Sequence, residues 1–133
     1  MSEKPAEPQL DRETIQEIQK GVQEFNSGKF FECHDTLEEI WRNFRGPARD
    51  FFQGLIQVSV GFYHLRNGNL LGARSQFEKA LRNLAPYGDR YAGVDLANLH
   101  SEVQSWLERI QKGGDLRGTL ADLPKLHFTP NSL

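Results

Sequence analysis

The chain has 133 residues, 38% of them hydrophobic, which suits a single domain with one core. Charged residues make up 26% and the formal net charge is -2, so the composition gives no bulk attraction to nucleic acid or to an anionic membrane. A single cysteine, Cys33, excludes an intramolecular disulfide. No apolar run is long enough to span a bilayer, and the N-terminal residues lack the apolar stretch of a signal peptide. We therefore expect a cytoplasmic protein without a membrane or nucleic-acid partner.

Residues 1–10 contain two prolines and little apolar mass, which predicts a flexible N-terminal arm. Asp11 is a suitable N-cap for a first helix, because apolar residues recur after it at helical spacing, namely Ile15, Ile18, Val22 and Phe25. Asn26-Ser27-Gly28 should end this helix, with Gly28 in the left-handed conformation of a C-cap.

A second helix is expected at about residues 29–43 and a third at about 48–66, with a Gly-Pro pair between them. The third helix is apolar on most sides, Tyr63 included, which is typical of a helix in the middle of a bundle. Two of its glycines lie two turns apart on one side, where a neighbouring helix can approach closely: Gly54 and Gly61.

An Asn-Gly-Asn turn leads to a fourth helix that Pro86 stops, a loop follows at residues 87–93, and a fifth helix is expected at about 95–111. The helical domain therefore covers residues 11–112. Residues 113–133 carry scattered leucines and should form a C-terminal tail packed on the domain.

A weak internal repeat supports this organisation. The segments "FNSGKFFECHDTLEEIWRNF" and "LRNGNLLGARSQFEKALRNL" align without gaps, so that Gly28 matches Gly68 and Leu37 matches Phe77. A repeated pattern of helix, glycine turn and helix is typical of arrays of helical hairpins of the tetratricopeptide kind. The predicted fold is therefore all-α, a five-helix bundle of two antiparallel hairpins and a capping helix, with a tetratricopeptide-like arrangement.

Two helices carry polar side chains on faces that should be buried. On the second helix, His34 and Glu38 stand one turn apart at the apolar face, whereas Thr36 lies on the opposite face and needs only solvent. On the third helix, a polar stripe consists of Gln53, Gln57 and His64. Buried polar groups must find partners. We therefore predict that one cavity is lined by His34, Glu38, Gln57 and His64, with Gln53 or Asp35 at its edge.

Three interpretations of this cavity remain open. The side chains can form a satisfied structural network, or a metal-free ligand or catalytic pocket. Alternatively, His34, Glu38 and His64 can hold a divalent transition metal, because imidazole and carboxylate suit zinc, iron, manganese or nickel and helical bundles build such sites from facing helices. Trp41 is expected to be a core anchor, and Cys33 a core thiol.

The stretch "HDTLEEIW", in which His34, Glu38 and Trp41 give the pattern HxxxExxW, resembles a prokaryotic family catalogued as domain of unknown function 309. The surrounding "FNSGKFFECHDTLEEIW" and the downstream "FFQGLIQ" and "GVDL" are similar to that family too, so the resemblance covers about residues 25–107. It implies a small all-α, tetratricopeptide-like domain. It also implies a motif that has been suggested to bind metal, here through His34 and Glu38, with Trp41 as a packing element.

Two functions of different classes follow. In the first, the chain is a helical scaffold that binds a protein or small-molecule ligand, a second copy of the chain included, and His34 and Glu38 only fix the packing. In the second, it is a metal-dependent, hydrolase-like enzyme in which a metal at His34, Glu38 and His64 activates water. The catalytic base would then be Glu38, if it is not a ligand, or Asp35.

Overall fold

The computed structural model describes residues 4–113, 116 and 123–130. This part of the chain contains five α-helices, whose bounds are α1 (Arg12–Asn26), α2 (Phe30–Asn43), α3 (Pro47–Arg66), α4 (Leu70–Leu84) and α5 (Leu96–Lys112). A 3-10 turn, η1 (Ala85–Tyr87), and a small antiparallel hairpin of β1 (Arg90–Tyr91) and β2 (Val94–Asp95) connect α4 to α5. The predicted all-α class is confirmed. None of the helices in the described residues has the length and apolar character to cross a lipid bilayer.

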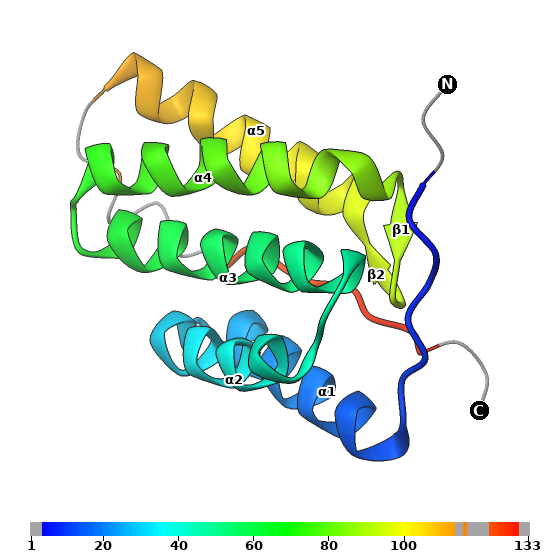
Figure 1. Cartoon of the computed structure of the whole chain (residues 1–133). Coiled ribbons are helices and arrows are strands. Elements are labelled where there is room, and N and C mark those ends of the chain that lie inside the picture. Colours follow the sequence, from blue (N-terminus) through cyan, green and yellow to red (C-terminus); the bar gives the residue numbers. More distant parts are fainter. Residues whose placement is uncertain (1–3, 114–115, 117–122, 131–133) are drawn as a thin grey trace.

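The helices are stacked so that neighbours in sequence are neighbours in space (Figure 1). The most extensive helix contacts join α1 to α2, α2 to α3, α3 to α4 and α4 to α5. Helix α3 lies in the middle, as its apolar pattern predicts. Its burial is incomplete, however. Tyr63, expected inside the bundle, is 38% exposed.

The two hairpins α1–α2 and α3–α4 turn in the same way. Gly28 and Gly68 have φ angles of +78° and +79°, a conformation that is accessible at little cost only to glycine. In both turns the amide after the glycine donates to the carbonyl five residues before it, at 2.8 and 2.9 Å, which closes a Schellman motif. The Arg66 guanidinium donates to the Gly28 carbonyl and so joins the two turns at one end of the molecule. The internal repeat is therefore a repeat of structure.

Phe62 on α3 is the centre of the core. Its ring is fully buried and contacts one aromatic ring from each of the other four helices. The centroid distances are 5.7 Å to Phe25 on α1, 5.5 Å to Phe30 on α2, 4.8 Å to Phe77 on α4 and 6.2 Å to Trp106 on α5. Such edge-to-face and stacked pairs contribute beyond the area that they bury.

Helices α3 and α4 approach each other most closely at the two glycines singled out in the sequence. A Cβ built on Gly54 would lie 2.6 Å from a Leu84 methyl, and a Cβ on Gly61 would clash with carbon atoms of the Phe77 ring. The predicted close approach of a neighbouring helix is confirmed at both positions.

Segments from both ends of the described chain lie against the β1–β2 hairpin (Figure 1). The tail accompanies β2 in an extended conformation, because the Asp95 amide donates to the His127 carbonyl at 3.0 Å and the Thr129 amide donates to the Gly93 carbonyl at 2.8 Å. Leu126 of the tail is buried. The part of the tail that is described thus packs on the domain, and residues 114–115, 117–122 and 131–133 lie outside the described residues.

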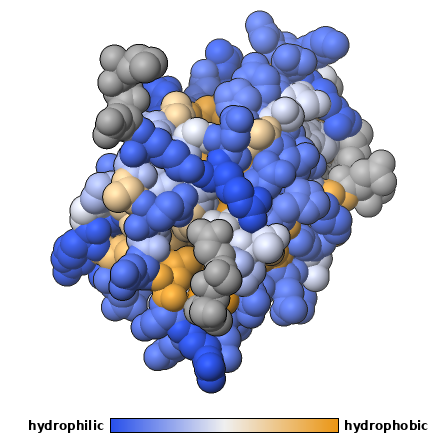
Figure 2. Space-filling model, turned by 90° about the vertical axis from the view of Figure 1, so that its right-hand side faces the viewer, coloured by the Kyte–Doolittle hydropathy of each residue, from blue (hydrophilic) through white to orange (hydrophobic). Residues whose placement is uncertain are grey.

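The N-terminal segment runs along the other side of the hairpin. The Tyr91 hydroxyl donates to the Ala6 carbonyl at 2.6 Å, and the Ala92 amide donates to the Glu7 carboxylate at 2.7 Å. The flexibility predicted for residues 1–10 stays a prediction. Their described part is hydrogen-bonded to the hairpin at these two points and through Lys4, which donates to the Arg90 carbonyl. Polar residues cover most of this face of the molecule, and apolar surface shows through only in small areas (Figure 2). The predicted loop at residues 87–93 contains β1 and the turn of the β1–β2 hairpin, and the N-terminal segment and the tail both pack against this hairpin.

Candidate functional site

A small surface pocket lies where α2 meets the last turns of α3. Its volume is about 170 Å³, and we call it the aromatic pocket, lined by Phe30, Phe31, His34, Val60, Tyr63 and His64. Two of the predicted site residues, His34 on α2 and His64 on α3, therefore meet here. Val60, one turn before His64, forms part of the wall between them.

Two exposed aromatic rings frame the aromatic pocket. Phe31 is 51% exposed and Tyr63 is 38% exposed, and their ring centroids are 5.7 Å apart. Each ring has an imidazole beside it, with His34 at 6.0 Å from Phe31 and His64 at 5.9 Å from Tyr63. Phe30, which is almost fully buried, closes the pocket from the core side. The site is thus mainly aromatic, with two imidazoles at its rim.

The predicted pair of His34 and Glu38 is formed. The Nε2 atom of His34 lies 3.1 Å from a carboxylate oxygen of Glu38, and its Nδ1 atom lies 3.3 Å from Asp35. The other oxygen of Glu38 accepts from the Arg42 guanidinium at 2.7 Å. His34 and Glu38 are both half-buried. Both nitrogens of the imidazole therefore lie close to carboxylate oxygens.

The remaining predicted residues lie elsewhere. Gln57 faces α4, where its side-chain oxygen accepts from Asn83 at 2.8 Å, and Gln53 is exposed. Trp41 is half-buried beneath the Arg49 guanidinium, 4.0 Å from the ring centroid, and its indole nitrogen is buried without a hydrogen-bond partner among the described residues. The structure thus brings His34 to Glu38, Asp35 and His64, but places the glutamines and Trp41 outside the aromatic pocket.

The metal prediction concerns His34, Glu38 and His64. In the described part of the chain, no three His, Cys, Asp or Glu side chains are grouped to share a metal ion. His34 and Glu38 pair with each other, and the Nδ1 atom of His64 lies 3.4 Å from the Asn69 amide nitrogen. Metal binding by His34, Glu38 and His64 therefore stays a prediction.

Three features of this region escaped the sequence interpretation. Phe31 stands three residues before His34, so helical phase places it near His34, but an exposed phenylalanine was not predicted there. Tyr63 was assigned to the core. Thr36, expected to be solvated, is buried and donates to the Glu24 carboxylate at 2.6 Å, because α1 covers this side of α2.

The thiol of Cys33 is a core group, as predicted. Burial raises its pKa to about 12, and the nearby Glu24 carboxylate adds to the increase. Because the thiolate is the nucleophile, we expect Cys33 in the folded protein to react with a disulfide reagent such as DTNB only as fast as the protein opens. Time courses with and without urea measure this. A stoichiometric reaction within seconds in native buffer would contradict the buried position.

This region is similar to a known protein family. The model of the family described as Domain of unknown function (DUF309) matches residues 18–76. This DUF309 segment comprises most of α1, all of α2 and α3 and the first turns of α4. Every residue that lines the aromatic pocket therefore lies inside it.

The chain is also similar to two bacterial proteins that carry no assigned function. It is 26% identical over 87 residues to an uncharacterized protein of Aquifex aeolicus (strain VF5), covering 65% of this chain and 25% of that protein. It is 33% identical over 85 residues to the uncharacterized protein YpuF of Bacillus subtilis (strain 168), covering 62% of this chain and 49% of YpuF. The chain thus matches about half of the length of one relative and about a quarter of the other.

Proposed function

We propose that this chain is a non-catalytic binding module that receives an apolar side chain of a protein partner in the aromatic pocket. The observation that carries the proposal is the pair of exposed rings, Phe31 and Tyr63, on either side of a preformed hollow. Aromatic side chains are enriched at protein interfaces, where a few of them supply most of the binding free energy.

The size of the pocket favours a side chain over a free ligand. Sites for small molecules and cofactors usually enclose about 300–1,000 Å³, whereas the aromatic pocket encloses about 170 Å³. Its floor belongs to the rigid core, because Phe30 packs on Phe25 and Phe62 at centroid distances of 5.3 and 5.5 Å. A rigid floor loses little conformational freedom when a partner binds, which favours affinity.

In this proposal His34 and Glu38 are positioning residues. Glu38 and Asp35 lie beside the two nitrogens of the imidazole, so the ring presents its carbon atoms to Phe31 and to the pocket. His64 on the facing helix is anchored less tightly, near Asn69. Phe31 with His34 on one side of the hollow and Tyr63 with His64 on the other set its width, which selects the side chain that enters.

A peptide-display selection against the purified chain tests the proposal. The selected peptides should share one apolar anchor position, and Phe31→Ala or Tyr63→Ala should weaken their binding at least about tenfold, the effect of losing an interface hot spot. Leu71→Ala is the matched control, because Leu71 is 81% exposed but does not line the pocket. Peptides whose affinity is the same for wild type and for both aromatic variants would contradict the proposal.

The second candidate, a metal-dependent hydrolase-like enzyme, is favoured by one observation, the 3.1 Å contact between His34 and Glu38 beside a pocket that also holds His64. Metal analysis of the protein purified without chelator distinguishes the metal-dependent enzyme from the non-catalytic binding module. One equivalent of a transition metal that is lost in a folded His34→Ala variant would favour the enzyme. Circular dichroism establishes whether that variant is folded.

A further inference from the structure

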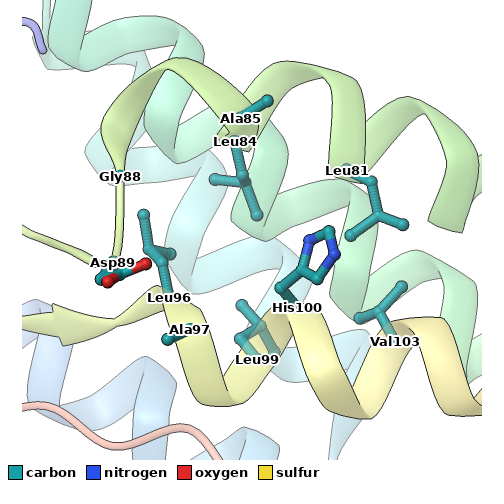
Figure 3. A pocket seen from close by; sticks show the side chains of 10 residues that line it. All are labelled: Leu81, Leu84, Ala85, Gly88, Asp89, Leu96, Ala97, Leu99, His100 and Val103. Carbon is teal, nitrogen blue, oxygen red and sulfur yellow. The ribbon is translucent and has the colours of Figure 1, made fainter.

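A second and larger cavity lies on the other side of the molecule, between α4, η1 and the first turns of α5 (Figure 3). We call it the α4–α5 groove. Its volume is about 400 Å³, within the range of about 300–1,000 Å³ that small-molecule sites occupy. The groove lies outside the DUF309 segment, so it is independent of the aromatic pocket. Its walls are mainly aliphatic: Leu81, Leu84, Leu96, Leu99 and Val103.

Two polar side chains stand at separate places along this apolar groove. Asp89 lies at one end, beside Leu96, and His100 lies nearer to the end formed by Leu81 and Val103 (Figure 3). Both are exposed, and neither side chain has a hydrogen bond or an ion pair with any other described residue. An apolar cavity with a few polar groups that converge on it is the usual form of a ligand site.

The charge at the Asp89 end selects a cation. The amide groups at the start of α5, which would otherwise attract an anion, are already used. Those of Leu96 and Ala97 donate to the Asp89 carbonyl at 2.9 and 3.1 Å, and that of Asn98 donates to the Asp95 carboxylate at 3.0 Å. What remains for a ligand at this end is the carboxylate of Asp89, which accepts hydrogen bonds only.

We propose that the α4–α5 groove binds a small primary amine with an apolar, aromatic body. The ammonium group pairs with the Asp89 carboxylate, the body lies on the leucine side chains, and its far end meets the His100 ring. A charge-assisted hydrogen bond fixes the orientation of the ligand, and burial of the body supplies the affinity. A carboxylate of the same shape would bring like charge to Asp89.

The test compares 4-phenylbutylamine with 4-phenylbutyrate, which have the same apolar body and opposite charge. Amide chemical-shift titrations of the full chain should show saturable binding of the amine, with the largest shifts around Leu81, Ala97 and His100. Asp89→Asn should weaken the binding of the amine by about fivefold, as expected for the loss of an exposed ion pair. The backbone of the loop should be unaffected, because the structural contacts of Asp89 are made by its carbonyl. Ala97→Trp, placed at the rim, should block both compounds.

Glu32→Gln is the matched control, since it removes an exposed carboxylate on α2, away from the groove. Three results would each overturn the inference. One is that 4-phenylbutyrate binds as tightly as the amine, and another is that the amine binds equally well to Asp89→Asn. The third is that the amine shows no saturable binding up to about 10 mM.

Discussion

Replacing Phe62 by alanine is expected to lower the free energy of unfolding by about 3–5 kcal/mol, the range measured when a buried aromatic side chain is truncated. The upper part of this range is favoured because the cavity left behind cannot collapse easily. Phe62 is fully buried and contacts a ring on each of the other four helices, so any one helix that moves to fill the space must leave its other contacts.

Urea denaturation followed by circular dichroism measures this difference. Tyr63→Ala is the matched control at the next position of α3, and we expect it to change stability by no more than about 0.5 kcal/mol, because Tyr63 is exposed. If Phe62→Ala does not fold, Phe62→Leu keeps much of the volume and should cost about 1–2 kcal/mol. A loss below about 1 kcal/mol for Phe62→Ala would mean that the five helices do not share this contact.

The fold was predictable because its signals are local. Each helix has its own apolar period, and each hairpin has its own turn glycine, so Gly28 and Gly68 could be placed before any tertiary contact was known. The short hairpin after α4 was missed for the opposite reason. Its strands are two residues long and are stabilised by segments distant in sequence, through Ala6 and His127. The likeness to tetratricopeptide arrays stays a prediction.

The candidate site was predictable only in part, because helical phase fixes a side chain's direction but not what covers it. His34 and His64 meet as the phase suggested. Gln57, on the same stripe as His64, is turned to Asn83 because α4 lies closer to that part of α3 than α2 does. Tyr63 was assigned to the core because its helix is apolar on most sides, whereas its side chain is 38% exposed at the edge of the α2–α3 contact.

A pair of glycine substitutions provides the second large expected effect, and the two have opposite signs. Alanine is favoured over glycine in a helix interior by roughly 0.5–1 kcal/mol, so both Gly21→Ala and Gly61→Ala gain this amount from the backbone. At Gly21 on α1 the new methyl group would meet Leu37 at 3.4 Å, an ordinary contact, and we expect a more stable protein.

At Gly61 the same methyl group would overlap the Phe77 ring, which is itself fully buried and packed on Phe62. The ring cannot move aside without displacing α4, and overpacking of this kind costs about 1–3 kcal/mol or more. We therefore expect Gly61→Ala to be less stable than wild type by about 1–2 kcal/mol after the backbone gain is subtracted. Thermal and urea unfolding of the two variants, measured side by side, give the signs directly. A Gly61→Ala variant as stable as Gly21→Ala would show that α3 and α4 are farther apart than the fold requires.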